Sequence, residues 1–169
     1  EAAVLGHVGA QYSYAYRLSQ GIGCVQDNVQ AVHWFLQSAQ GGKAPAQRAL
    51  GKIYLKGIGV IQDTAQAVHW FTLAAHQGDA EAQYQLALLY AQGRGVTQNN
   101  ERALELCQQA ANSGDADAQR TLGNWYQYGN VCGTANLGLA FAWAQKAALQ
   151  GNAAAQNQLA RMYYFGRGV

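Results

Sequence analysis

Apolar residues recur along this chain at helical spacing, in two alternating patterns. In the first pattern they stand four residues apart, as at Ala82, Leu86 and Tyr90. In the second they occupy positions i, i+3, i+4, i+7 and i+8, as at Ala67, Trp70, Phe71, Ala74 and Ala75. Both spacings line one face of an α-helix. The chain is therefore predicted to form pairs of amphipathic helices, and each helix has one face to bury.

The two-helix pattern repeats about every 36 residues, which makes internal repetition the main feature of the sequence. Ala-Gln pairs mark the first helix of each unit, at Ala10-Gln11, Ala46-Gln47, Ala82-Gln83, Ala118-Gln119 and Ala155-Gln156. Glycines follow with the same spacings at Gly21, Gly57, Gly93, Gly129 and Gly166. Large apolar residues mark the second helices at Trp34, Trp70, Leu106 and Trp143. The markers agree that a single residue is inserted between Gly129 and Ala140.

Capping residues predict where these helices begin and end. Side chains suited to an N-cap precede the second helices at Asp27, Asp63, Asn99 and Asn136, and precede first helices at Asp79, Asp115 and Asn152. Glycines that favour a left-handed conformation end the second helices at Gly42, Gly78, Gly114 and Gly151. Gly-x-Gly turns, such as Gly57 to Gly59, are expected to join the two helices of a unit.

Short helices of this kind are marginal alone, and one hairpin cannot bury its apolar face, whereas stacked hairpins can. We therefore expect a single all-α solenoid over residues 1–169. Its predicted parts are the tail of a preceding repeat (1–6), four repeats (7–42, 43–78, 79–114 and 115–151) and a partial fifth repeat (152–169). Both ends fall within a repeat, so we expect flanking repeats in the full-length protein.

One repeat carries a dense set of motif residues, and it resembles the Sel-one-like repeat, a relative of the tetratricopeptide repeat with a longer interhelix loop. The residues are Ala46-Gln47, Leu50-Gly51, Tyr54, Gly57-Ile58-Gly59-Val60, Asp63, Ala67, Trp70, Ala74-Ala75 and Gly78. The resemblance covers the whole chain. It implies a right-handed α/α superhelical solenoid and a bacterial, non-enzymatic protein-binding scaffold or adaptor. A cognate partner that neutralises a secreted effector is an alternative within the same family.

The resemblance also implies a binding surface, because tetratricopeptide solenoids bind peptides along the concave face lined by first helices. The corresponding positions here are Tyr12, Tyr16, Arg48, Lys52, Lys56, Tyr84, Leu88, Gln92, Arg120, Asn124, Tyr128, Arg161 and Tyr164. They include five of the eleven basic residues and no acid. Arg and Tyr are favoured in binding hot spots. We expect a partner protein or peptide with an acidic segment or a C-terminal carboxylate; the alternative is a positively charged, solvated helix face.

Composition and charge narrow the partner classes. The net charge of +2 is too weak to indicate nucleic acid. No apolar run reaches the roughly 18 residues that a membrane span requires. Compartment, whether bacterial cytoplasm or periplasm, and oligomeric state are left open by the sequence.

Few residues suggest chemistry, and we expect no metal, no cofactor and no catalytic residue. His33 and His69 precede tryptophans in two copies of one motif, but they flank the apolar stripe and are expected at the surface. The Gly-x-Gly turns lack the Lys-Ser/Thr ending of a phosphate-binding loop. Three free thiols are expected, with Cys107 in the core because it occupies the position of Phe71. A hydrolase on the same scaffold, using Cys24 with His33, is the less favoured alternative.

Overall fold

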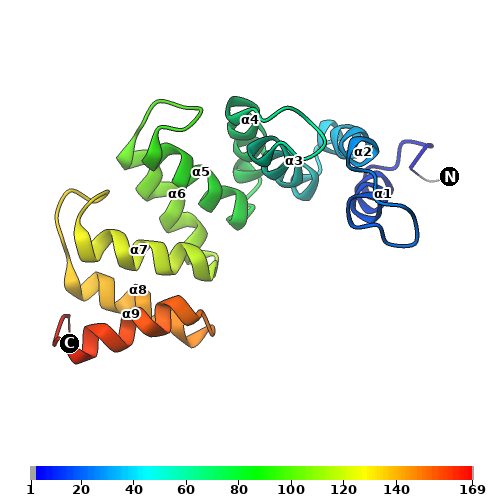
Figure 1. Cartoon of the computed structure of the whole chain (residues 1–169). Coiled ribbons are helices and arrows are strands. Elements are labelled where there is room, and N and C mark those ends of the chain that lie inside the picture. The colour runs from blue at the N-terminus through cyan, green and yellow to red at the C-terminus, as the bar shows by residue number, and fades with distance from the viewer. Residues whose placement is uncertain (1–2, 169) are drawn as a thin grey trace. The chain divides into compact units, whose positions relative to one another are not determined.

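The computed structural model describes residues 3–168, and within them it contains nine α-helices and no strand (Figure 1). The helices are α1 (Val8–Gln20), α2 (Asn28–Gln40), α3 (Ala44–Lys56), α4 (Thr64–His76), α5 (Ala80–Gln92), α6 (Asn100–Asn112), α7 (Ala116–Tyr128), α8 (Leu137–Leu149) and α9 (Ala153–Tyr164). The all-α helical repeat predicted from the apolar spacing is confirmed.

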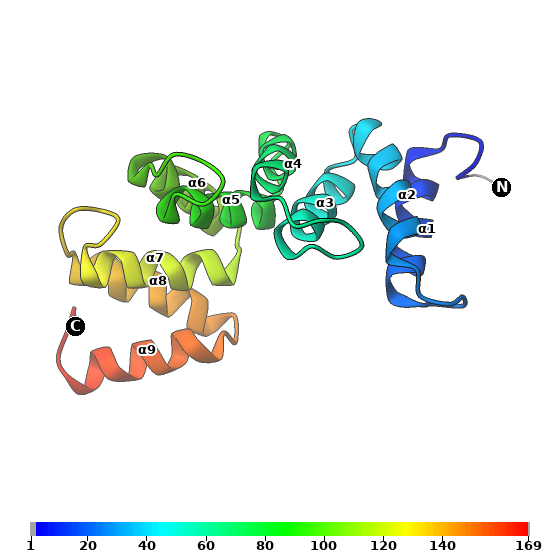
Figure 2. The same ribbon diagram turned by 45° about the horizontal axis from the view of Figure 1, so that its top comes forward.

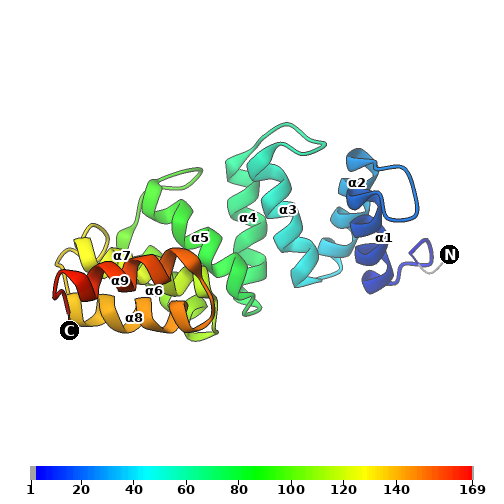
Figure 3. The same ribbon diagram turned by 60° about the horizontal axis from the view of Figure 1, so that its bottom comes forward.

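The chain forms two compact units. Unit 1 contains the residues up to Ala82 together with Arg94–Val96, and unit 2 contains Gln83–Gly93 and the residues from Thr97 onward. In unit 1, α1 packs on α2, α2 on α3 and α3 on α4 (Figure 2). In unit 2, α6 packs on α7, α7 on α8 and α8 on α9 (Figure 3). Within each unit, consecutive helices are therefore neighbours, as stacked hairpins require.

The predicted helix boundaries are confirmed by hydrogen bonds at the caps. The side chain of Asp63 accepts a hydrogen bond from the backbone N–H of Gln66, and the other predicted N-cap residues do the same for the third residue after them, at Asp27, Asp79, Asn99, Asp115, Asn136 and Asn152. The glycines expected after second helices have φ between 82° and 93°, at Gly42, Gly78, Gly114 and Gly151. Only glycine adopts this backbone region without strain.

The core of each hairpin lies along the predicted stripe of its second helix. In α4 the buried residues are Ala67, Trp70, Phe71, Ala74 and Ala75, and in α6 they are Ala103, Leu106, Cys107, Ala110 and Ala111. Cys107 is therefore buried, as predicted. The other two tryptophans of the second helices, Trp34 and Trp143, are half-buried. The stripe predicted to face inward thus does so in both units.

Close packing inside unit 1 explains a glycine in the first-helix motif. A Cβ added at Gly51 in α3 would lie 2.6 Å from the ring of Phe71, which is fully buried in α4. The matching glycine of unit 2, Gly123, meets its nearest atoms at 3.3 Å, because Ala144 stands where unit 1 has the phenylalanine. Helix α3 can therefore approach α4 closely only because residue 51 has no side chain.

Candidate protein-binding surfaces

Two hollows contain predicted groove residues, one in each unit. The hollow in unit 1, here called hollow 1, has a volume of about 590 Å³. Its apolar lining comes from α1, α2, α3 and the loop after α3, at Tyr12, Tyr16, Phe35, Ala49, Ile53 and Ile58. The Tyr12 ring lies 5.8 Å from the ring of Phe35, centroid to centroid, and 6.5 Å from that of Tyr16. Hollow 1 therefore has an aromatic floor that the hairpin core supports.

Arg48 and Lys52 line hollow 1 as well, but their charges are not free. The Arg48 Nη1 lies 3.0 Å from Asp79 Oδ2, and its Nε lies 3.3 Å from Glu81 Oε2. Lys52 Nζ pairs with the second oxygen of Glu81. Two acids thus balance two bases, so the prediction of a positively charged surface at Arg48 and Lys52 is wrong.

Sequence reasoning missed these acids because it considered groove positions alone. Asp79 and Glu81 stand at the beginning of α5, outside the groove positions, and Asp79 also caps that helix. They reach back to side chains on α3, the preceding first helix of the same unit. Comparing the groove positions of each first helix with the first turn of the next first helix would have predicted these ion pairs.

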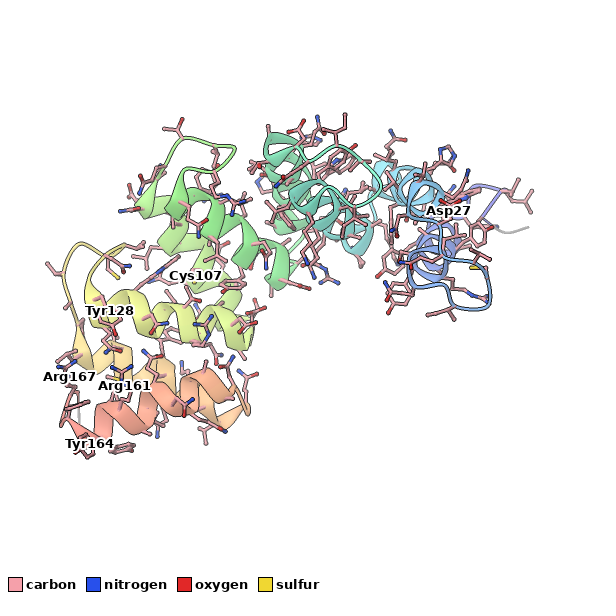
Figure 4. The ribbon with its side chains drawn as sticks, viewed as in Figure 1. Asp27, Cys107, Tyr128, Arg161, Tyr164 and Arg167 are labelled. Atoms are coloured by element: carbon pink, nitrogen blue, oxygen red, sulfur yellow. The ribbon has the colours of Figure 1, made fainter. Side chains whose placement is uncertain are left out.

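The hollow in unit 2, here called hollow 2, is smaller, with a volume of about 180 Å³. Side chains from α7 and α9 line it, at Arg120, Asn124, Gln127, Tyr128, Ala154, Asn157, Gln158 and Arg161. Figure 4 labels two of them, Tyr128 from α7 and Arg161 from α9. Six of the eight carry an amide or a guanidinium group, the other two are Tyr128 and Ala154, and none of the eight is acidic.

The charges of hollow 2 are less balanced than those of hollow 1. Arg120 has the same repeat position as Arg48, but the positions of Asp79 and Glu81 are occupied here by Asn152 and Ala154. The acid nearest to Arg120 is Asp117, whose Oδ1 lies 3.8 Å from the Arg120 Nε and also accepts a hydrogen bond from Asn152. Arg161 makes no ion pair within residues 3–168.

One of the side chains that line hollow 2, Gln158, has a buried acceptor without a donor in the described part of the chain. The Gln158 side chain donates through Nε2 to Gln127 Oε1 at 3.1 Å. Its own Oε1 is buried and has no hydrogen-bond partner in the described part of the chain. Such a group costs free energy unless something donates to it.

The remaining groove residues lie outside both hollows. Tyr84 is buried, and its hydroxyl lies 3.1 Å from the Thr121 Oγ1; burial raises the pKa of Tyr84. Packing therefore explains why a tyrosine stands at position 84, and this buried side chain is not available to a partner. Lys56, Gln92 and Tyr164 are exposed, and Leu88 is half-buried. A third hollow, around Tyr14 and Trp34 in unit 1, contains none of the predicted groove residues.

The residues considered for chemistry lie apart from these hollows. The Cys24 Sγ is 3.8 Å from the carbonyl oxygens of Arg17 and Ile22, and the His33 Nε2 is 2.9 Å from the Gln37 side-chain nitrogen. His33 and His69 are exposed, as predicted. Residues 3–168 contain no group of three or more metal-ligating side chains, and no helix among them is long and apolar enough to span a membrane.

The Sel1 repeat family model matches residues 8–43, 44–79, 80–115, 116–152 and 153–169. The chain therefore belongs to the Sel1 repeat family, the family that its motifs resemble. Sel1 repeat proteins are generally protein-interaction scaffolds, and their fold is typically non-catalytic. A search of curated proteins found no match.

Solved structures agree with the family assignment. The chain is 39% identical to c5321, a protective antigen of uropathogenic Escherichia coli with an SLR fold, with a TM-score of 0.93 over 99% of this chain and 36% of that one. It is 32% identical to a Sel1 repeat protein from Oxalobacter formigenes, with a TM-score of 0.90 over 97% of this chain and 65% of that one. The chain is 22% identical to Helicobacter pylori cysteine rich protein B, with a TM-score of 0.56 over 69% of this chain and 89% of that one. This likeness supports the fold alone.

These neighbours are bacterial, in line with the bacterial origin that the resemblance implied. The chain spans about a third of the length of the c5321 structure and about two thirds of the Oxalobacter one.

Proposed function

We propose that this chain is a protein-binding scaffold that holds a segment of a partner protein against its first helices. The observation that carries the proposal is hollow 1, because four of the predicted groove residues, Tyr12, Tyr16, Arg48 and Lys52, line it together. Its volume of about 590 Å³ lies within the roughly 300–1,000 Å³ range of ligand pockets.

The lining of hollow 1 suits an apolar or aromatic side chain of the partner. Tyr12, Phe35 and Ile53 offer apolar surface at its floor. Arg48 and Lys52 are held by Asp79 and Glu81, so they form a polar rim of fixed geometry without a net positive charge. Buried aromatic anchors in a pocket with a polar rim are typical of binding hot spots.

The acidic preference predicted from the sequence fits unit 2 better than unit 1. In hollow 1 an incoming carboxylate would have to compete with Glu81 for both cations. In hollow 2, the acid next to Arg120 is Asp117, which lies 3.8 Å away and is 63% exposed. We therefore propose that the partner supplies an apolar anchor to unit 1, while unit 2 takes the negative charge.

The test is selection of peptides from a displayed random library on the immobilised chain. We expect enriched peptides that share an aromatic or large aliphatic residue and bind wild type. Ala49→Trp, which fills hollow 1 from α3, should weaken their binding at least tenfold. Ala65→Trp makes the same change on an exposed part of α4 and should leave binding unchanged.

Two results would overturn the proposal. One is a selection that enriches no peptide family. The other is a peptide family that binds the Ala49→Trp variant as tightly as wild type, while circular dichroism shows that both proteins are folded.

A further inference from the structure

We propose that one face of the second helix α8 binds the surface of an anionic lipid bilayer. This face, here called the α8 face, consists of Leu139, Ala142, Trp143, Lys146 and Leu149. It belongs to neither hollow and to no first helix, so the proposal adds a second interaction to the scaffold function and does not depend on it. Three features support it: exposed apolar side chains, a positive charge without acids, and a surface without a pocket.

The α8 face is a helical stripe that the neighbouring helices leave open. Its residues recur at the three- and four-residue intervals that place side chains on one side of an α-helix. Ala140, Ala144 and Ala147 lie on the opposite side and are buried, where α8 packs on α7 and α9 (Figure 3). Leu139 is 42% exposed and Leu149 is 83% exposed. Two large aliphatic side chains are therefore exposed on a helix whose core side is already filled.

The other second helices are polar at the positions of these two leucines. Helices α2, α4 and α6 have Gln30, Gln66 and Arg102 at the first position, and Gln40, His76 and Asn112 at the second. These polar side chains are at least partly exposed too, so exposure at both positions is a general feature of the repeat. Contiguous apolar residues at positions that every repeat leaves exposed mark an interaction site.

The charge of the segment around α8 indicates a negatively charged partner. Residues 118–169 contain no acid and four of the eleven basic residues, whereas residues 1–117 contain all nine acids. Lys146 stands on the α8 face itself, and its Nζ lies 4.1 Å from the centroid of the Trp143 ring. Apolar side chains next to a basic residue, with no acid nearby in sequence, are typical of a helix that lies on an anionic membrane surface.

A bilayer surface fits the α8 face better than a second copy of the chain does. Lysine can extend its ammonium group to the headgroups while its stem stays among apolar neighbours, and tryptophan is favoured at the same depth. A second copy packed antiparallel on the α8 face would instead bring Lys146 close to its own counterpart. Neither α8 contains an acid that could balance the two charges.

A bilayer surface also fits better than a segment of a partner protein. Protein interfaces are anchored by side chains that fill pockets. The three hollows described above are lined by other helices and loops, and no residue of the α8 face lines any of them. Membrane binding at an interfacial helix needs no pocket, because it depends on apolar area and on attraction to anionic lipids.

The proposal can be tested by sedimenting the chain with vesicles made of equal parts of phosphatidylglycerol and phosphatidylcholine. Vesicles of phosphatidylcholine alone serve as the reference. We expect saturable binding to the anionic vesicles and at least tenfold weaker binding to the neutral ones. Added salt should weaken the binding to anionic vesicles, because it screens exposed charges.

Variants locate the contact on α8. Leu139→Gln together with Leu149→Gln gives α8 the glutamines that α2 has at both positions, and it should weaken binding to anionic vesicles at least tenfold. The matched control, Val25→Gln together with Ile61→Gln, removes two exposed apolar side chains from loops of unit 1 and should leave binding unchanged. Lys146→Gln should weaken binding to anionic vesicles about fivefold and leave binding to neutral vesicles unchanged. Circular dichroism checks that each variant folds.

The proposal is overturned if the chain does not sediment with anionic vesicles, if neutral vesicles bind it as tightly, or if the double leucine variant binds like wild type. A wild-type dimer that the double leucine variant dissociates, seen by analytical ultracentrifugation, would assign the α8 face to a second copy and overturn it as well. So would library peptides that lose affinity in the double leucine variant, because the face would then bind protein. The scaffold function is tested separately, by peptide binding to hollow 1 and its loss in Ala49→Trp.

Discussion

Arg48 in hollow 1 and Arg120 in hollow 2 have the same repeat position, on α3 and α7, but the charges around them differ. In unit 1 the following first helix brings Asp79 and Glu81 to the arginine, whereas in unit 2 it brings Asn152 and Ala154. The charge around each of these arginines is therefore decided by the first turn of the next first helix, and not by the groove positions alone.

The largest predicted effect is a loss of stability in unit 1 that leaves the region around hollow 2 protected. Phe71→Ala should lower the free energy of unfolding by about 3–5 kcal/mol, because it empties a fully buried site above Gly51. In repeat proteins such losses fall mainly on the altered repeat and its neighbours. Hydrogen exchange should show lost protection in unit 1 and retained protection around hollow 2. Equal loss in both units would contradict the separation.

The next effect isolates the role of Asp79. Asp79→Ala removes an N-cap, worth about 1 kcal/mol, and a partly buried partner of Arg48, worth up to about 1 kcal/mol. Asn152→Ala in unit 2 removes only the cap and its bond to Asp117. Urea denaturation should therefore show a larger loss for Asp79→Ala. Equal losses would mean that the ion pair to Arg48 contributes nothing.

A third effect changes the charge of hollow 1. Glu81→Ala should free Lys52 and one side of Arg48, so that hollow 1 gains measurable binding of acetate, about tenfold above wild type or ~1.4 kcal/mol. Titration followed by amide shifts near Arg48 would measure it. Glu105→Ala, which breaks an exposed pair with Arg102 on α6, is the matched control and should create no acetate site in hollow 1.

The smallest effect is a pH dependence confined to unit 2. Burial raises the pKa of Tyr84, so the folded state favours the protonated phenol. The resulting stability is present below the unfolded pKa of about 10 and is lost as pH rises through the higher folded value. Denaturation between about pH 9 and 11 should show a steeper loss for wild type than for Tyr84→Phe. The raised pKa of the Cys107 thiol acts in the same direction in both proteins, so it cancels in the comparison.

Most of the fold could be predicted because it depends on local rules that repeat. The caps at Asp63 and Asn99, the left-handed Gly78 and the stripe around Phe71 follow from backbone geometry and from helical periodicity. Because the same pattern recurs in each copy of the repeat, chance does not explain it. This is why even the burial of Cys107 could be predicted from its position alone.

The candidate site was harder to predict because it depends on contacts between repeats. Groove positions alone did not reveal that Glu81 reaches Arg48 and Lys52. They also did not reveal that Tyr84 turns into the core and meets Thr121, where the repeats on either side have Arg48 and Arg120. Both outcomes depend on side-chain direction across a helix interface, which the apolar pattern does not specify.

The most direct test of this account is to exchange the two charge patterns in one protein. In the double variant Glu81→Ala with Ala154→Glu, Lys52 and one side of Arg48 lose their acid, while Arg120 gains one. Titration with acetate, followed by amide shifts, should then report a site near Arg48 and Lys52 and none near Arg120. Shifts that remain at Arg120 would contradict the claim that the next first helix decides the charge around these two arginines.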